Sequence, residues 1–256
     1  MHNFNKKSVL ITGGTSGIGY ELAKSFIAAK AKCTISGRRA EGAELAQGIG
    51  AGFVPCDVSK EPDVKKALQE AGQNEPLDVL ILNAGIAVES ESLADLSLAD
   101  FEQLLATNTV GVFLFLKHAA DYMSDGGSIV VTGSVAGSGM TIPGEGGYAA
   151  SKAAAAYLMR TAALELAPRN IRVNAVCPAV ISGTGMMVAD DGNDDARFLA
   201  SLTAFDRMGR ISEAVEAFMF LASDKASFIT GQELSVDGGM NAGLGLPILD
   251  GVGRRL

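Results

Sequence analysis

Residues 8–19 read SVLITGGTSGIG, and this stretch decides the fold. A short run rich in β-branched residues ends at Thr12, and glycines then occupy positions 13, 17 and 19. Gly13 suits a tight turn, Gly17 lets the backbone approach a ligand, and Gly19 lets a helix pack close to the strand. The N-terminus of that helix would present free N–H groups and a partial positive charge. Strand, glycine turn and helix in this order predict a dinucleotide phosphate site, and the alternative is a tight connection without a ligand.

Strand-like and helix-like segments alternate along all 256 residues. Several of the strand segments are continuously apolar, which is typical of strands covered on both faces. Strands are expected at residues 8–12, 32–36, 52–56, 79–83, 128–132, 172–177 and 233–236. Helices are expected at about 17–30, 40–48, 60–72, 100–123, 147–167 and 212–222. This alternation predicts a single α/β domain over residues 1–256, of the Rossmann type: a doubly wound, seven-stranded parallel sheet with helices on both faces.

The composition excludes several classes of protein. A net charge of -8 and a pI near 4.8 argue against a surface that binds nucleic acid or anionic membranes. Cys33, Cys56 and Cys177 lie in separate strand-like runs without metal-like spacing, so buried free thiols and no metal site are expected. The N-terminus lacks the apolar core of a signal peptide, and no apolar run reaches the roughly 18 residues of a membrane helix. A cytoplasmic protein is therefore expected.

One connection is unusually long. Residues 179–206 contain two methionines, four closely spaced aspartates and the apolar run FLASL. Such a connection inside a compact domain is usually functional or disordered, and this one follows the carboxyl end of a strand, where open α/β sheets bind ligands. It is interpreted as a substrate lid. A surface loop without a role is the alternative.

The end of the second strand segment indicates which cofactor binds. Sites for NAD usually place an acidic residue there, about 20 residues beyond the glycines, to accept from the ribose 2′-OH. This chain has Arg38 and Arg39 instead, with no acid before Glu41. A guanidinium pairs with a 2′-phosphate in bidentate fashion, which favours NADP(H). The alternative is a pair of solvated arginines beside an NAD site that lacks its usual acid.

Two further strand ends carry candidate cofactor residues. Asp57 and Val58 follow the third strand segment, where the carboxylate could contact an adenine edge or cap the next helix. Asn83, Ala84 and Gly85 end the fourth segment, and the two small residues let the backbone lie close to a ribose. The Asn83 side chain could equally brace neighbouring strands.

Tyr148 and Lys152 are four residues apart in an Ala-rich stretch, so a helix places both side chains on one face. An ammonium beside a phenol favours the phenolate, which lowers the tyrosine pKa from about 10 toward the working range of a general acid or base. Ser134 follows the fifth strand segment, at the same edge of the sheet. Taken alone, Ser134 would more often cap a helix or turn, Tyr148 would more often pack at a helix start, and Lys152 would more often be a solvated surface charge. Together they suit proton transfer to a ketone oxygen while a nicotinamide supplies the hydride.

Asn108 lies in a strongly apolar segment predicted to be helical, where a polar amide needs a partner. It could bend the helix and hold a water that links Lys152 to solvent. Packing against a loop is the alternative.

These motifs together resemble the classical short-chain dehydrogenase/reductase family over essentially the whole chain, from Thr12 to Gly239. TGGTSGIG resembles the family's TGxxxGxG turn, and the order of Asn108, Ser134, Tyr148 and Lys152 resembles its catalytic tetrad. Such families commonly form homotetramers or homodimers. The chain departs from the family at Pro178-Ala179, where Pro-Gly is common. The cofactor residues that the resemblance and the motifs imply are Gly13, Thr15, Ser16, Gly17, Ile18, Gly19, Arg38, Arg39, Asp57, Val58, Asn83, Ala84, Gly85, Tyr148, Lys152, Pro178, Ile181 and Thr184.

The sequence therefore predicts an NADP(H)-dependent oxidoreductase that interconverts a ketone and a secondary alcohol. A non-catalytic NADP(H)-binding sensor or scaffold on the same fold is the alternative, because fold alone does not give function. An epimerase or dehydratase is disfavoured by the chain length and the glycine spacing. An apolar substrate pocket is expected from Met140, Ile142, Met186, Met187 and Phe198.

Overall fold

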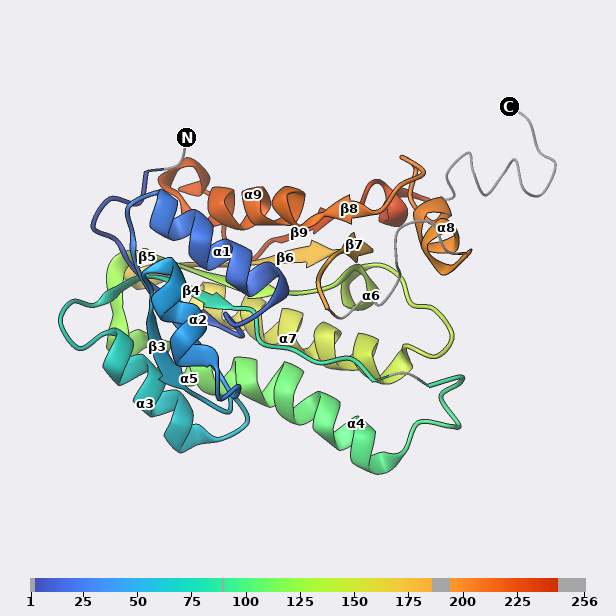
Figure 1. Cartoon of the computed structure of the whole chain (residues 1–256), viewed down its shortest axis with the longest axis horizontal. Coiled ribbons are helices and arrows are strands. Elements are labelled where there is room, and N and C mark those ends of the chain that lie inside the picture. Colours follow the sequence, from blue (N-terminus) through green and yellow to red (C-terminus); the bar gives the residue numbers. More distant parts are fainter. Residues whose placement is uncertain (1–2, 89, 186–193, 244–256) are drawn as a thin grey trace.

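The computed structural model describes residues 3–88, 90–185 and 194–243. Within these ranges, seven parallel strands form one sheet in the order β3-β2-β1-β4-β5-β6-β9 (Figure 1). The chain moves from β1 to one edge, returns to β4 beside β1 and then proceeds to the other edge, so the sheet is doubly wound, as predicted. The strands are β1 (Ser8–Thr12), β2 (Lys32–Gly37), β3 (Gly52–Pro55), β4 (Leu77–Leu82), β5 (Met123–Thr132), β6 (Arg172–Pro178) and β9 (Glu233–Val236).

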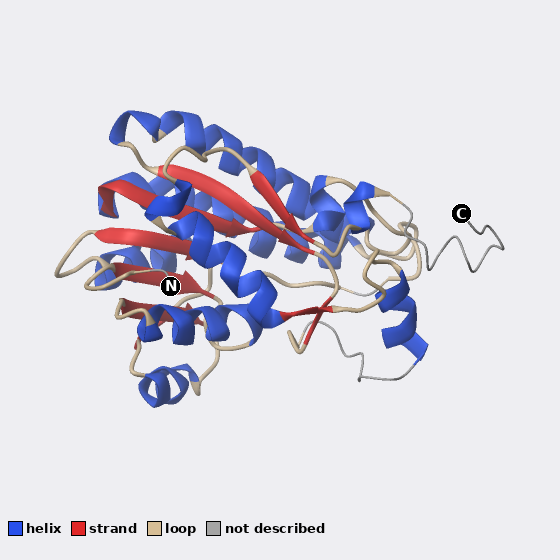
Figure 2. Ribbon diagram, turned by 90° about the horizontal axis from the view of Figure 1, so that it is seen from above, coloured by secondary structure: helices blue, strands red, loops and turns tan. Residues whose placement is uncertain are grey.

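Helices cover both faces of this sheet (Figure 2). One core lies between the sheet and α1, α2 and α9, and includes Phe26 and Phe218. The other lies between the sheet and α3, α5 and α7, and includes Phe115 and Met159. Because both faces are covered, every residue of β1 and of β6 is buried, and the polar Arg172 and Asn174 of β6 donate to backbone carbonyl oxygens. The helices are α1 (Gly17–Ala28), α2 (Gly42–Ile49), α3 (Glu61–Ala71), α5 (Gly111–Tyr122), α7 (Gly146–Glu165) and α9 (Ile211–Ala222).

The helix expected over residues 100–123 differs from the prediction. It begins earlier as α4 (Leu98–Leu104), widens into a π-helical turn (Leu105–Val110) and continues as α5, and β5 already starts at Met123. The side chain of Asn108, in the π-helical turn, bonds to the backbone of Ile86 and to Ser151. A π-helical turn accommodates one additional residue, and such turns are frequent at functional sites.

The long connection after β6 is partly structured. A two-residue strand β7 (Ile181–Ser182) pairs in parallel with β8 (Gly209–Arg210), and α8 (Asp194–Ser201) lies between them in the chain. All three lie beyond the carboxyl ends of the main strands (Figure 1). Met186, Met187, Asp190 and Asp191 lie outside the described residues. The remaining short helical turns are α6 (Val135–Ser138), Ala167–Arg169, Asp224–Ala226 and Met240–Ala242.

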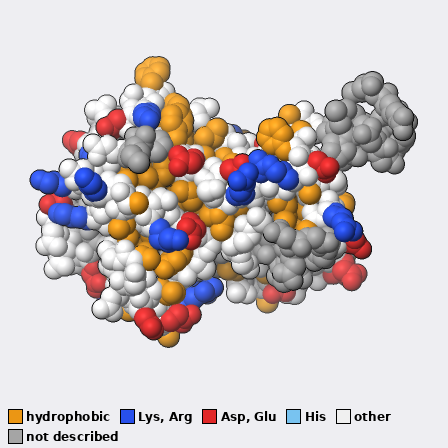
Figure 3. Space-filling view, turned by 45° about the horizontal axis from the view of Figure 1, so that its top comes forward, with side chains coloured by type: hydrophobic (Ala, Val, Ile, Leu, Met, Phe, Trp, Pro, Cys, Tyr) orange, Lys and Arg blue, Asp and Glu red, His pale blue; other side chains and the backbone are white. Residues whose placement is uncertain are grey.

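Three further features bear on the class of protein. Cys33, Cys56 and Cys177 are buried free thiols, as predicted. In the described ranges no helix is long and apolar enough to cross a membrane, and no three His, Cys, Asp or Glu side chains gather as metal ligands would. On the face that Figure 3 shows, Lys and Arg side chains are interspersed with Asp and Glu instead of forming one basic patch.

Candidate active site

A cavity of about 710 Å³ opens at the carboxyl ends of the sheet strands. The turns after β1, β2, β3, β4, β5 and β6 all border it, because parallel strands end at one edge of the sheet. Of the predicted site residues, those that line it are Gly13, Thr15, Ser16, Gly17, Ile18, Arg38, Arg39, Asp57, Val58, Asn83, Ala84, Gly85, Ser134, Tyr148, Lys152, Pro178, Ile181 and Thr184. Gly19 and Asn108 lie behind its wall.

The glycine-rich turn leaves space and hydrogen-bond donors at one end of the cavity. Gly13 has a φ of +64°, and a Cβ there would lie 2.8 Å from the Cα of Ala84. Helix α1 begins at Gly17, and the side chain of its N-cap, Ser16, makes no capping hydrogen bond. The first N–H groups of α1 are therefore not used by that side chain, which fits the binding of a diphosphate. A Cβ at Gly17 would lie 2.7 Å from the carbonyl oxygen of Thr184, so the backbone after β7 packs closely against this turn.

The turns after β2 and β3 border the cavity next to this end. Arg38 and Arg39 are exposed, and no acidic side chain of the β2 turn lies with them in the cavity wall. One carboxylate oxygen of Asp57 accepts from the backbone N–H and the hydroxyl of Ser59, at 3.0 and 2.7 Å. Burial acts to raise the pKa of Asp57, but these bonds and the charge of Arg38 lower it overall. Asp57 thus stabilises the turn before α3 and does not cap the helix itself, whose N-cap is Lys60.

Asn83 braces the strands, which is the structural role considered for it. Its amide nitrogen donates to the carbonyl oxygens of Thr12 and Gly13, at 3.2 and 3.1 Å. Its side-chain oxygen accepts from the hydroxyl of Thr132 at 3.2 Å. The Thr12 hydroxyl in turn accepts from the backbone N–H groups of Asn83 and Ala84. What remains for a ligand at this turn is backbone and the small side chains of Ala84 and Gly85.

Ser134, Tyr148 and Lys152 meet at the other end of the cavity. Ser134 is the N-cap of α6, and its hydroxyl accepts from the N–H of Ala136 at 3.2 Å. Tyr148 stands in the first turn of α7 and is half-buried. The Nζ of Lys152 lies 5.7 Å from the centre of the Tyr148 ring and donates to the carbonyl oxygen of Thr132 at 2.8 Å.

The pKa expected for Tyr148 requires a correction. Burial raises the pKa of Tyr148 to about 12, while the interaction with Ser134 acts to lower it and the charge of Glu145 raises it further. Burial also lowers the pKa of Lys152 to about 8. The predicted lowering of the tyrosine pKa by the lysine is therefore wrong for this arrangement. Burial disfavours the charged form of each group, so it raises the pKa of the phenol and lowers the pKa of the ammonium.

Asn108 is 1% exposed and fully engaged. Its oxygen accepts from the N–H of Ile86 at 2.9 Å, and its nitrogen donates to the carbonyl oxygen of Ile86 and the hydroxyl of Ser151, at 2.9 and 3.0 Å. This is the packing against a loop considered as its alternative role. A Cβ at Gly85 would lie 3.3 Å from the Asn108 oxygen and 3.2 Å from the Lys152 nitrogen, so both residues border the same turn.

The predicted apolar pocket is only partly correct. Met140 and Ile142 line the cavity, but Phe198 is 61% exposed and does not, while Leu199 and Leu202 of the same segment do. The periodicity of α8 could have distinguished these faces. Sequence reasoning also missed Glu145, whose position one helical turn before Tyr148 was a usable signal.

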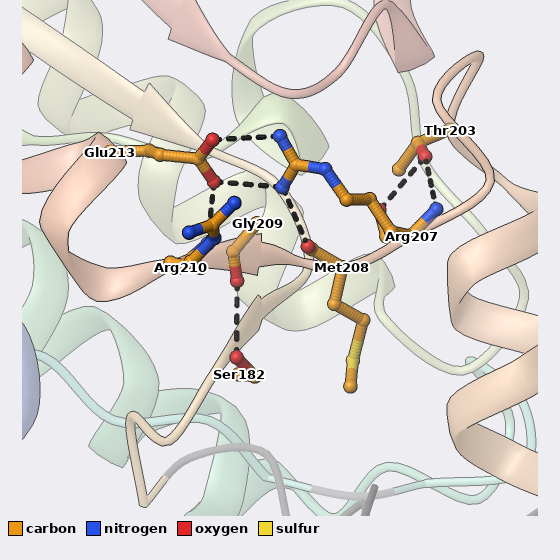
Figure 4. Close-up of polar contacts among 7 residues, drawn as sticks. All are labelled: Ser182, Thr203, Arg207, Met208, Gly209, Arg210 and Glu213. Carbon is orange, nitrogen blue, oxygen red and sulfur yellow. Dashed lines mark hydrogen bonds and ion pairs between the residues drawn. The ribbon is translucent and has the colours of Figure 1, made fainter. Parts of the chain in front are cut away.

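An ion pair between Arg207 and Glu213 lies where the long connection after β6 ends, at β8 and the start of α9 (Figure 4). The guanidinium of Arg207 donates to both carboxylate oxygens of Glu213, at 2.9 and 2.7 Å, and also to the carbonyl oxygen of Met208. Glu213 additionally accepts from the N–H of Arg210 at 2.8 Å. These contacts tie β8 to the start of α9.

Comparisons with known proteins agree with this geometry. The family model described as enoyl-(acyl carrier protein) reductase, a short-chain dehydrogenase/reductase model, matches residues 13–241. The glucose 1-dehydrogenase of Gluconobacter oxydans is 37% identical over 93% of this chain and 92% of its own. The cyclic-di-GMP-binding biofilm dispersal mediator protein of Escherichia coli is 35% identical over 94% and 100%.

A solved structure shares the fold. A mutant short-chain dehydrogenase/reductase of Serratia marcescens superposes with a TM-score of 0.86 at 29% identity, over 94% of this chain and 100% of its own. The fold, the family model and the curated relatives all lead to one assignment. The chain belongs to the short-chain dehydrogenase/reductase family of oxidoreductases.

Proposed function

We propose that this oxidoreductase interconverts a ketone and a secondary alcohol with NADP(H). The observation that carries the proposal is one cavity with two chemically distinct ends. Ser134, Tyr148 and Lys152 meet at one end, and the glycine-rich turn with Arg38 lies at the other. The first end suits proton transfer, and the second suits a phosphorylated dinucleotide.

The residues present fit NADP(H). When bound, this cofactor supplies or accepts the hydride. The N–H groups at the start of α1 would hold its diphosphate, and Arg38 with Arg39 would pair with a 2′-phosphate. Gly13, Ala84 and Gly85 leave room for close approach of the backbone. Asn108 would support this turn, and a water-holding role for it remains a prediction.

The chain's own residues handle the proton. In the reducing direction the substrate oxygen gains negative charge, which the hydroxyls of Ser134 and Tyr148 stabilise by donating hydrogen bonds. Tyr148 then gives its proton to that oxygen, completing the new O–H bond, while the carbonyl carbon gains the hydride. A tyrosine with a raised pKa carries its proton at neutral pH, which suits this direction. The ammonium of Lys152, held by Thr132, stabilises the phenolate left behind.

A sensor or scaffold is the second candidate. This candidate is supported by the similarity to the Escherichia coli biofilm dispersal mediator protein, whose name describes binding of cyclic di-GMP and no reaction. A sensor would bind NADP(H) and leave ketones unchanged.

Oxidation of NADPH with a panel of ketones separates the two candidates. The wild type should turn over at least one ketone, and Tyr148→Phe should lower kcat by roughly 10²–10⁴-fold, the usual contribution of general acid–base catalysis. Binding of NADPH, followed by its fluorescence, should change little in the variant. Binding by the wild type without turnover on any ketone would support the sensor.

We further propose a homotetramer, with a homodimer as the smaller possibility, acting in the cytoplasm. Apolar side chains stand exposed on the outer faces of α5 and α7, where Phe113, Tyr157 and Leu164 are 43%, 70% and 78% exposed. Apolar side chains exposed on neighbouring helices are a common mark of an interface.

A further inference from the structure

Glu145 places an unpaired carboxylate in the catalytic cavity. The residue lines the cavity, is half-buried and stands one helical turn before Tyr148. Among the described residues, its carboxylate has no hydrogen bond and no ion pair. It is close enough to raise the pKa of the Tyr148 hydroxyl through its charge. A second ionisable side chain therefore faces the space where the substrate must lie.

The backbone around Glu145 is held in place. Gly144 has a φ of +88°, and its carbonyl oxygen accepts from the hydroxyl of Ser90 at 2.7 Å. A Cβ at Gly144 would lie 2.4 Å from the carbonyl oxygen of Ser90, so the two loops touch here. The N–H of Glu145 donates to the carbonyl oxygen of Ile142 at 3.1 Å. These contacts hold the backbone from which the Glu145 side chain extends at the cavity wall.

A structural role does not account for this carboxylate. Glu145 occupies the N-cap position of α7, but its side chain makes no capping hydrogen bond. A negative charge near a helix N-terminus stabilises the helix only slightly. Glu145 is half-buried, and this burial raises the pKa of its carboxyl group. Removing a charge from water is unfavourable unless a partner offsets it.

The cavity wall itself offers no such partner. The cations that line it in the described part of the chain are Arg38, Arg39 and Lys152. The two arginines follow β2, at the cofactor end, and Lys152 donates to Thr132. A cation brought by the substrate would satisfy the carboxylate, whereas an anionic substrate would be repelled.

We propose that Glu145 determines specificity by pairing with a protonated amine on the substrate, so that the preferred substrates are amino ketones and the corresponding amino alcohols. This inference rests on the proposed function, because it assigns a substrate class to the same cavity. The amine takes no part in the reaction. It anchors the substrate while the hydride moves at the neighbouring carbon and the proton moves through Tyr148.

Three alcohols of matched shape test the inference. In 1-amino-2-hexanol an ammonium occupies the place that a methyl group takes in 3-heptanol, and 2-hydroxyhexanoate carries a carboxylate there. With NADP⁺, at a pH that keeps the amine protonated, the amino alcohol should exceed 3-heptanol in kcat/KM roughly tenfold or more, as expected for a charge-assisted bond. The hydroxy acid should be the poorest substrate. Glu145→Gln should bring the first two within about threefold of each other, a residual set by the neutral amide.

Two controls keep the test decisive. Glu145→Asp retains the charge and should retain a preference for the amine, and thermal unfolding reports whether each variant folds. Calorimetric binding of the three alcohols to the NADP⁺-saturated Tyr148→Phe variant, with and without Glu145→Gln, gives the same comparison with turnover suppressed. Equal kcat/KM and equal affinity for the amine and 3-heptanol would overturn the inference and leave the proposed function standing. Failure of the ketone panel would instead count against the proposed function, and the binding comparison would still decide the role of Glu145.

Discussion

The ammonium group of Lys152 lies in the protein interior. Only 4% of the residue is exposed, and the ammonium donates a hydrogen bond to the carbonyl oxygen of Thr132. Burial lowers its pKa from 10.5 to about 8. Between these two pH values the Lys152 side chain binds more protons in the unfolded chain than in the folded protein, so its own contribution to stability becomes less unfavourable as the pH rises. Below about pH 8 the destabilisation is present in full. A residue held at such a disadvantage is typical of a functional site.

Lys152→Met should stabilise the protein below pH 8 and abolish turnover. The gain is at most about 3 kcal/mol, and loss of the bond to Thr132 offsets part of it. Guanidinium unfolding at pH values below 8 and above 10.5 measures both the gain and its pH dependence. The difference in stability between variant and wild type should be largest below pH 8 and should shrink as the pH rises to 10.5. A variant with the same pH dependence as the wild type would show that the pKa of Lys152 is not lowered by folding.

The choice of cofactor also belongs to single residues. Arg38→Ala should raise the KM for NADPH roughly 10- to 100-fold, because a charge-assisted contact contributes about 1.5–3 kcal/mol, and leave the KM for NADH nearly unchanged. Lys65→Ala, which removes a positive charge at an exposed position of α3 outside the cavity wall, is the control. Initial rates with both cofactors provide the measurement. Parallel losses with NADPH and NADH would contradict a contact with the 2′-phosphate.

Two elements around the cavity are held by polar contacts that cross between segments. The π-helical turn positions Asn108, whose amide bonds to the backbone of Ile86 on the opposite loop. Beside β8, the guanidinium of Arg207 pairs with the carboxylate of Glu213 in the first turn of α9. The hydrogen bonds from Arg207, followed by that from Arg210, lower the pKa of Glu213 to about 2. Glu213 therefore stabilises the folded protein above its ordinary pKa of 4.5 and loses that effect as the pH falls through about 2.

Glu213→Gln should make the protein less sensitive to acid between pH 4.5 and pH 2, while lowering its stability at neutral pH. The amide keeps the shape of the side chain but loses its charge. Thermal unfolding across this pH range, compared between wild type and variant, reports the difference. Glu102→Gln, at an exposed position of α4, is the control. An unchanged acid profile would show that the ion pair contributes nothing to stability, as many exposed pairs do.

The whole molecule presents apolar side chains that its own fold leaves exposed. Tyr157→Glu and Leu164→Glu place a charge on the outer face of α7 and should reduce the proposed tetramer to smaller species, because a charge buried at an interface is unfavourable. Sedimentation velocity measures the change. Gln69→Glu, at an exposed position of α3, adds the same charge elsewhere and should have no effect. A wild type that sediments as a monomer would contradict the proposal at once.

Local patterns of residues were enough to predict the sheet, the helices that flank it and most of the residues that line the cavity. Continuous apolar runs such as residues 9–11 of β1 are typical of strands covered on both faces, and parallel strands bring their carboxyl ends to one edge. Nearly every predicted site residue therefore lines one cavity. These inferences need only local spacing and the topology that follows from it.

Only the tertiary structure decided the electrostatics and the side-chain partners. The pKa of Tyr148 is raised and not lowered, because burial depends on segments far apart in the chain. Asn83 and Asn108 are occupied by backbone groups of other segments, and Phe198 faces outward while Leu199 lines the cavity. Among the described residues, the carboxylate of Glu145 has no partner, and this depends on which side chains the fold brings near it. Desolvation and long-range contacts sum over the folded molecule, and no local pattern of residues contains that sum.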